Sequence, residues 1–155
     1  MISETRNCDC LEFRPARPSD LPQVLAMLGQ AKLPAAGVAQ GLSHFFVADN
    51  GGTLVGAAGL ELYEASALLR SVVVEDSWRG TGVGKSLIDR ALDEARRRGV
   101  DDVFLLTTTA EHYFPRFGFT CVSRDSVTED VKASVEFQGA CPSSAVVMRK
   151  TLRRN

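Results

Sequence analysis

The segment at residues 79–84 constrains the fold of this chain more than any other feature of the sequence. It reads RGTGVG and lies between an apolar run at 67–74 and a helical pattern that begins at Val83. Glycines allow a backbone to approach a ligand closely, and a helix N-terminus adds roughly half a unit of positive charge. A buried strand, a glycine-rich loop and a helix in this order predict a site for phosphate or pyrophosphate.

Three phosphate-binding patterns can be compared with this loop. A P-loop, G-x-x-x-x-G-K-[ST], would end at 84–86 and would need a glycine where Arg79 stands. A dinucleotide fingerprint, G-x-G-x-x-G, would need a glycine in place of Lys85. The pattern R-x-x-G-x-G is met by Arg79, Gly82 and Gly84, and it is the pyrophosphate loop of acyl-CoA N-acyltransferases. A glycine-rich connector without a ligand is the alternative.

Composition and charge limit the class of protein. The chain has 155 residues and a net charge of −1, with 18 basic and 19 acidic residues. We therefore expect one domain and no dominant attraction to nucleic acid or to an anionic membrane. The apolar runs are too short to span a bilayer, and the start lacks a secretory signal, which predicts a cytoplasmic protein. We expect a flexible leader at 1–10 and a single domain at 11–155.

The four cysteines lack the spacing of a zinc site, so no metal is expected. Cys8 and Cys10 fit either a soft-metal pair or, more simply, two ordinary thiols in a loose leader. Cys121 follows an apolar stretch and is predicted to be a packed thiol. Cys141 precedes a proline at an expected loop-to-strand boundary, and no chemistry is assigned to it.

The apolar periodicity predicts a mixed α+β fold. Residues 21–28 have the spacing of an amphipathic helix, and the sequence DNGG at 49–52 predicts a hairpin turn. We expect a short helix at 110–117 and a longer one at 126–137, with Ser126 as its N-cap. The expected strands are 12–16, 44–48, 53–63, 67–74, 103–107, 119–123 and 144–152, with a crossover helix at 83–98.

These features together resemble the GNAT superfamily of acyl-CoA N-acyltransferases. The resemblance covers residues 13–152, because the first helix, the hairpin, the apolar strand, the 79–84 loop and the Phe-Gly-Phe step at 117–119 come in that superfamily's order. It implies a mixed, mostly antiparallel central sheet of six to seven strands, flanked by helices and splayed in the middle for acyl-CoA. Segments 105–110, 117–119 and 141–148 are similar to the arsenic-resistance N-acetyltransferases and, more distantly, to short N-acetylglutamate synthases.

The resemblance implies acetyl-CoA as the co-substrate. The backbone at 72–74 would pair with the pantetheine arm, the N–H groups of the 79–84 loop would hold the pyrophosphate, and the start of the following helix would assist. The expected cofactor-binding residues are Val72, Val73, Val74, Arg79, Gly80, Thr81, Gly82, Val83, Gly84, Lys85 and Ser86.

Acetyl transfer to an amine needs a base for the ammonium group and a proton for the leaving thiolate. Members of the superfamily often use a glutamate as the base and a tyrosine four residues before the Gly-Phe step as the acid, but that position is Phe114 here. Either Tyr113 is the acid through a local shift, or no side chain fills that role. Glu61 and Glu64 are the candidate bases, with a solvent-facing carboxylate as the alternative for Glu61. His112 is a weaker candidate.

Arg70 interrupts the apolar strand, and a buried guanidinium needs a partner. A substrate carboxylate fits this role through a bidentate fork. The alternative is an internal salt bridge with Glu61, Glu64 or Glu136. We expect Glu64, Ser134 and Glu136 to contribute, with Arg70, to the acceptor site.

The sequence thus predicts a cytoplasmic N-acetyltransferase that passes the acetyl group directly, in a ternary complex, to the amine of a small amino acid or analogue. The resemblance implies a glutamate-like acceptor, such as arsinothricin, in an arsenic-resistance context. Only small-molecule partners are expected; dimers are common in the superfamily, but nothing in the sequence fixes one. The alternative is a non-catalytic sensor that binds acetyl-CoA and never releases free thiol.

Overall fold

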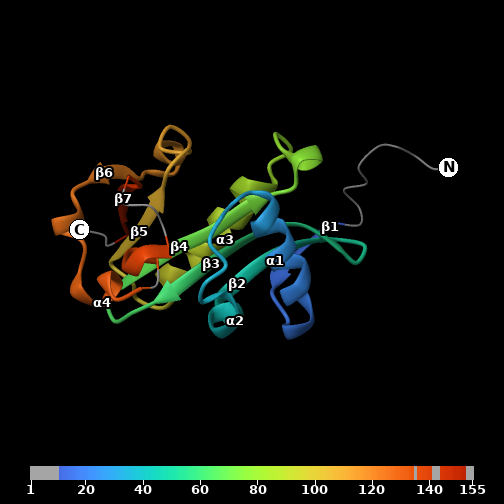
Figure 1. The fold of residues 1–155 in the computed structure, drawn as a ribbon, viewed down its shortest axis with the longest axis horizontal. Coiled ribbons are helices and arrows are strands. Elements are labelled where there is room, and N and C mark those ends of the chain that lie inside the picture. The colour runs from blue at the N-terminus through green and yellow to red at the C-terminus, as the bar shows by residue number, and fades with distance from the viewer. Residues whose placement is uncertain (1–10, 135, 141–143, 153–155) are drawn as a thin grey trace.

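The computed structural model describes residues 11–134, 136–140 and 144–152, which fold around one seven-stranded sheet. The strand order is β1-β2-β3-β4-β5-β7-β6, and every neighbouring pair is antiparallel except β4 and β5. Figure 1 shows β1 and β2 toward one end of the sheet and β5, β6 and β7 toward the other. The strands are β1 (Leu11–Pro15), β2 (Phe45–Asn50), β3 (Thr53–Leu62), β4 (Ser66–Val74), β5 (Asp102–Thr107), β6 (Thr120–Val122) and β7 (Val146–Thr151). The predicted fold class is confirmed.

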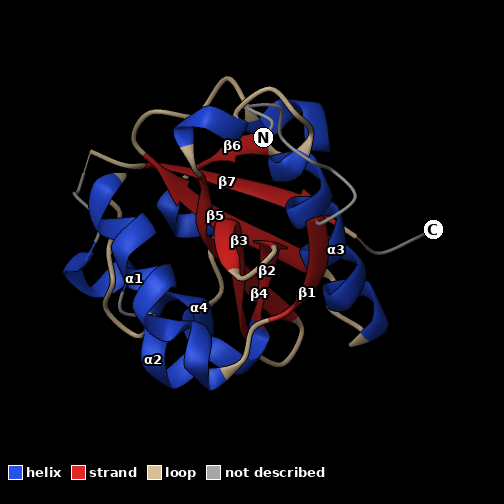
Figure 2. Cartoon of the chain, turned by 90° about the vertical axis from the view of Figure 1, so that its right-hand side faces the viewer, coloured by secondary structure: helices blue, strands red, loops and turns tan. Residues whose placement is uncertain are grey.

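Helices cover both faces of this sheet (Figure 2). They are α1 (Leu21–Gln30), α2 (Val38–Gly41), α3 (Val83–Arg97) and α4 (Glu129–Lys132). Val24 and Leu28 of α1 pack with Val47 of β2, whereas Leu87 of α3 packs with Ala48, the next residue along the same strand. Successive strand residues point to opposite faces, so α1 and α3 cover opposite sides. The helices in the described ranges lack the length and apolar character that a bilayer crossing requires.

The central strands β4 and β5 separate soon after they meet. They pair in parallel over Ser66–Leu68 and Asp102–Phe104, and the ladder ends there. Farther along β4, Ser71 and Val72 together lie opposite one residue of β3, Ala58, which is a β-bulge. Ser71 has a φ of 59°, in the left-handed region that residues with a side chain rarely adopt. The bulge bends β4 next to the gap, and the expected splay in the middle of the sheet is present.

The predicted helix at 126–137 is wrong. Thr128, not Ser126, is the N-cap of α4, which ends at Lys132, and a distorted helical turn follows at Glu136–Ala140. Ser126 instead closes a 3₁₀ turn, and the backbone between it and α4 is extended. The reason is packing, because Val127 is buried with Phe104 of β5 and needs an extended backbone to reach it.

Two smaller expectations also fail. The predicted helix at 110–117 is reduced to a 3₁₀ turn at Phe114–Phe117. Pro115 lies inside this turn and has no N–H to donate to the preceding turn, which works against a regular α-helix here. Cys121 is exposed, not packed, because β6 is the outer strand at this end of the described sheet.

Candidate functional site

A cavity of about 1280 Å³ lies where β4 and β5 separate. Its walls come from the connection from α1 to α2, the second half of β4, the glycine-rich loop with α3, and the stretch from the end of β5 to Phe117, together with Glu136, Ala145 and Lys150 of the C-terminal part. Most charged side chains along it are basic. The basic side chains are Lys32, Arg70, Arg79, Lys85, Arg96, Arg116 and Lys150, against the acidic Asp89 and Glu136. The cleft is therefore suited to an anionic ligand although the chain as a whole is nearly neutral.

The glycine-rich loop forms one end of this cleft. Gly80 and Gly82 have φ values of 78° and 92°, and a Cβ placed on either would meet no atom within 4 Å. Gly82 is the N-cap of α3, so the first N–H groups of that helix lack carbonyl partners within it. Trp78 is buried beneath the loop among side chains of the core. The result is an open backbone cradle that fits a pyrophosphate.

The side chains of the loop lie outside the cradle. Arg79 pairs with Asp76 at 3.3 Å and Lys85 with Asp89 at 2.7 Å, and both basic groups are largely exposed. The N–H of Ser86 donates to the carbonyl of Gly82, so it belongs to the helix rather than to the cradle. The backbone N–H groups therefore form the cradle itself, and the two exposed basic side chains lie at its rim.

The backbone of β4 continues the cleft from the loop toward the centre of the sheet. Val72, Val73 and Val74 line the cavity, and Val73 and Val74 pair with β3 on one side. The ladder to β5 ended at Leu68, so the other edge of β4 faces the gap. An extended chain with amide groups can add to such an edge, as a further strand would.

Tyr113 faces the cleft from the opposite wall. Its hydroxyl lies 3.1 Å from the position that a Cβ on Gly84 would take, and the guanidinium of Arg116 stacks 4.6 Å from its ring centre. Phe114 is buried in the core, where its ring meets Phe119 edge-on, and it too borders the cavity. Burial raises the pKa of Tyr113, so the phenol keeps its proton at neutral pH. Because the segment is not a regular helix, the residue beside the usual tyrosine position reaches the cleft.

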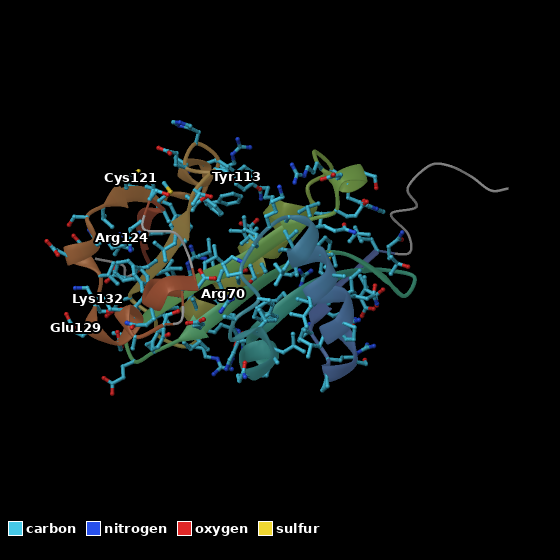
Figure 3. All side chains as sticks on the ribbon, in the orientation of Figure 1. Arg70, Tyr113, Cys121, Arg124, Glu129 and Lys132 are labelled. Carbon is cyan, nitrogen blue, oxygen red and sulfur yellow. The ribbon has the colours of Figure 1, made fainter. Side chains whose placement is uncertain are left out.

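Arg70 lies at the other end of the cleft and connects four segments of the chain. Both Arg70 and Tyr113 are labelled in Figure 3. Its side chain is 1% exposed. Nη1 donates to the carboxylate of Glu61 at 2.8 Å, and Nε donates to Oγ of Ser71 at 3.0 Å. Nη2 donates to the carbonyl of Pro34 at 3.3 Å and lies 3.3 Å from the carboxylate of Glu136. The internal salt bridge that the sequence left as an alternative is thus present, and Arg70 still lines the cavity.

Glu61 pairs with Arg70 and is not among the residues that line the cavity, although its side chain is 20% exposed and that of Arg70 only 1%. Burial alone would raise the pKa of this carboxyl. Hydrogen bonds from Ser134, Tyr63 and Arg70 outweigh burial, and the pKa falls below its usual range. The phenol of Tyr63 donates to Glu61 at 2.7 Å. Glu61 therefore holds Arg70 in place, and its role as the base stays a prediction, since 20% of its side chain is exposed.

The other expected acceptor residues divide into two groups. Ser134 and Glu136 are buried beside Arg70 and Glu61, and the N–H of Glu136 donates to Oγ of Ser134 at 3.2 Å. Glu64 lies in the exposed turn between β3 and β4 and does not line the cavity. Sequence reasoning missed Ser71, Tyr63 and the carbonyl of Pro34. Ser71 and Tyr63 are sequence neighbours of Arg70 and Glu61, and only the contact with Pro34 joins distant segments. Cys8, Cys10 and Cys141 lie outside the described residues.

Comparison with known proteins identifies the family. A family model described as the acetyltransferase (GNAT) domain matches residues 41–121, over half of the chain. This chain belongs to the GNAT acetyltransferase family. An amino-acid acetyltransferase of Mycobacterium tuberculosis is 31% identical over 141 residues, which are 84% of this chain and 80% of that protein. An amino-acid acetyltransferase of Ralstonia nicotianae is 31% identical over 111 residues, but these cover 70% of this chain and only 24% of the relative.

Solved structures of GNAT proteins have the same fold. An N-acetylglutamate synthase of Neisseria gonorrhoeae, complexed with coenzyme A and N-acetyl-glutamate, superimposes with a TM-score of 0.80 at 22% identity over 93% of this chain and 35% of that one. A Mycobacterium tuberculosis protein in complex with CoA gives 0.78 at 25% identity over 92% of this chain and 99% of that one. GNAT acetyltransferases use acetyl-CoA, so the expected co-substrate and enzyme class are confirmed.

Proposed function

We propose that this GNAT enzyme acetylates the α-amine of a free amino acid or a close analogue, with a glutamate-like acceptor as the first candidate. The observation that carries the proposal is the pairing of two sites in one cleft: a backbone cradle for pyrophosphate at one end and buried Arg70 at the other. Guanidinium is the natural partner of a carboxylate, which every amino-acid acceptor carries. The names of the relatives from Mycobacterium tuberculosis and Ralstonia nicotianae support the same class of acceptor.

The cofactor would lie along the residues that the sequence singled out. In this proposal the N–H groups of the 79–84 loop hold the pyrophosphate, Lys85 assists at the start of α3, and the backbone of Val72 and Val74 pairs with the pantetheine arm. The N–H of Ser86 is taken by the helix and has no part in it. Bound acetyl-CoA supplies the acetyl group as a thioester. The chain contributes position and charge, and the acetyl group would pass to the acceptor directly in a ternary complex.

Tyr113 is our candidate for the group that gives a proton to the leaving sulfur. Tyr113 lines the cleft, and Tyr63 is instead committed to Glu61. Burial raises the pKa of Tyr113, so the phenol carries a proton at neutral pH but gives it up less readily than an exposed phenol would. A CoA thiolate is already a fair leaving group, so the proton accelerates the reaction without being essential.

A finer proposal concerns the acceptor itself. The similarity of segments 105–110, 117–119 and 141–148 to the arsenic-resistance branch supports arsinothricin, an arsenic-containing analogue of glutamate, as an acceptor. The cytoplasmic location, a homodimeric state and the lack of nucleic-acid or membrane partners stay predictions.

The test is a thiol-release assay with acetyl-CoA and a panel of amines, preceded by calorimetric titration of the protein with acetyl-CoA. We expect one-to-one binding and release of free thiol that depends on an α-amino acid. Binding without release from any amine would instead favour the sensor alternative. Release with simple amines but with no amino acid would contradict the acceptor class, while leaving the enzyme class in place.

A further inference from the structure

We propose that Lys32 binds an anionic group on the side chain of the amino-acid acceptor, so that the enzyme selects acceptors with a second negative charge. The inference rests on the proposed function, because it concerns which amino acid would be chosen in that cleft. It adds a residue that the sequence did not single out.

Lys32 lies close to Arg70 in the fold. Lys32 and Pro34 both line the cavity, in the connection from α1 to α2. The carbonyl of Pro34 accepts a hydrogen bond from Nη2 of Arg70 at 3.3 Å. Consecutive Cα atoms are about 3.8 Å apart, so the Cα of Lys32 lies within about 8 Å of that of Pro34. Lys32 therefore belongs to the end of the cleft near Arg70, which we call the acceptor end.

The backbone at Lys32 has a conformation that favours glycine. Its φ is 59°, its N–H donates to the carbonyl of Gly29, and the N–H of Leu33 donates to the carbonyl of Leu28. These two bonds form the Schellman motif that ends a helix, and its left-handed residue is usually glycine. A lysine at this position has a conformational cost. A residue kept in such a conformation beside a cleft points to a function of its side chain.

The ammonium group of Lys32 differs from most cations of the cleft, because it is not engaged by another group. The basic side chains along the cavity that pair with carboxylates are Arg70, Arg79, Lys85 and Arg96. Arg116 stacks on Tyr113, and Lys150 lies on β7. Within the ranges that the structure describes, the side chain of Lys32 forms no hydrogen bond or ion pair. Arg70 is already balanced by two carboxylates, so Lys32 brings an unbalanced positive charge to the acceptor end.

The chemistry of an ammonium group indicates the class of acceptor. Lysine presents a compact point charge on a flexible stem, whereas the planar guanidinium is matched to the shape of a carboxylate. Lys32 would therefore recognise negative charge rather than one shape, and a carboxylate or a bulkier oxyanion would both fit. Leu33 and Pro34 line the same part of the cavity and offer apolar surface to methylene groups. The acceptor that fits is an α-amino acid with a short acidic side chain.

The proposal is tested first on the unaltered protein. Rates of thiol release are compared for L-glutamate and L-glutamine, for L-aspartate and L-asparagine, and for arsinothricin as a bulkier acid. Each amide is close to its acid in shape and lacks the charge. We expect kcat/KM for an accepted acid to exceed that for its amide by about 10–150-fold, the range for one hydrogen bond to a charged group. Because Lys32 is exposed, the preference should shrink at high salt. Amides that are used as well as the acids would overturn the proposal.

The second test uses the variant Lys32→Asn, with Arg97→Gln as its matched control. Asparagine tolerates a left-handed backbone, so this change removes the charge without new strain. We expect KM for the acidic acceptor to rise by about 10–150-fold, with kcat and the Kd for CoA almost unchanged and partial recovery in Lys32→Arg. Arg97 is 74% exposed and does not line the cavity, so Arg97→Gln should keep the kinetics of the unaltered protein. An unchanged KM in Lys32→Asn would refute the role of Lys32. An equal loss of CoA affinity would also refute it, since the ammonium group would then serve the cofactor phosphates.

The outcomes separate this inference from the proposed function. If amino acids are acetylated with no preference for acids, the proposed function stands and the inference fails. If no α-amino acid is acetylated, both fail. Lys32→Gly adds a measurement that does not depend on activity: relief of the left-handed strain should raise the unfolding temperature by about 2–4 °C. A lower unfolding temperature would show that this lysine serves the fold, and the inference would be overturned.

Discussion

Substituting Gly82 by aspartate tests where the CoA pyrophosphate lies. Gly82 has a φ of 92°, and a Cβ added there would meet no atom within 4 Å. The substitution therefore introduces no clash, and its backbone cost is about 1–2 kcal/mol. Because Gly82 is the N-cap of α3, an aspartate there can accept hydrogen bonds from the first N–H groups of the helix. The fold should survive the change.

The effect on the cofactor is expected to be much larger. A carboxylate about 4 Å from a phosphate charge repels it by about 4 kcal/mol at the effective dielectric of a protein surface, which corresponds to a loss of affinity of about a thousandfold. The control is Gly82→Ala, which carries the same backbone cost and no charge. Calorimetric titration with CoA and thermal unfolding should be run on both variants. Equal affinity for CoA in the aspartate and alanine variants would refute the placement of the pyrophosphate.

Three further predictions concern single residues. Gly59→Ala should destabilise the fold by about 1–3 kcal/mol, the usual cost of overpacking, because the new Cβ would lie 2.4 Å from the ring of Phe45. Chemical denaturation measures this loss, and an unchanged unfolding midpoint would contradict the close packing of Gly59 against Phe45. Tyr113→Phe should lower kcat while leaving the Kd for CoA almost unchanged, and an equal kcat would exclude this phenol as the acid. Asp20→Asn should lower the free energy of unfolding by roughly 3 kcal/mol, because it weakens a buried ion pair with Arg14 in which the two contacts are 2.8 and 3.0 Å. Hydrogen bonds from Arg14 lower the pKa of Asp20 in the folded protein. The stabilisation that Asp20 gives to the fold is therefore complete above the unfolded pKa of about 4 and disappears as the pH falls through the lower folded value. Unfolding midpoints that fall equally with acid in the unaltered protein and in Asp20→Asn would contradict this.

The sequence alone was enough to predict those elements whose structure depends on residues close together in the chain. The glycine-rich loop, the helix that follows it and the strand before it were placed within a residue or two, because periodicity and turn chemistry act over short distances. The splayed pair of strands followed from the resemblance rather than from the periodicity. The helix at 126–137 failed since nothing local shows that Val127 is needed in the core.

For the end of the cleft near Arg70, the sequence predicted which residues take part but not how they lie relative to one another. Arg70 was recognised as a charge that needs a partner, and Glu61 and Glu136 were among the partners considered. Their relative positions depend on the bulge at Ser71 and on the turn that carries Glu136, which are consequences of tertiary packing. Sequence position alone could not show that Glu61 and Glu136 both pair with this one guanidinium.

The two ends of the cleft differ in the kind of atoms that form them, and this bears on how the enzyme can be altered. The donor end consists mainly of main-chain groups in the 79–84 loop and in β4, which most amino-acid substitutions leave intact. The acceptor end consists of side chains brought from separate segments, such as Arg70 and Glu136. If the proposed function holds, exchanging those few side chains would redirect the enzyme toward a different amine while it keeps the same acetyl donor. Libraries for a new acceptor are therefore best confined to the acceptor end.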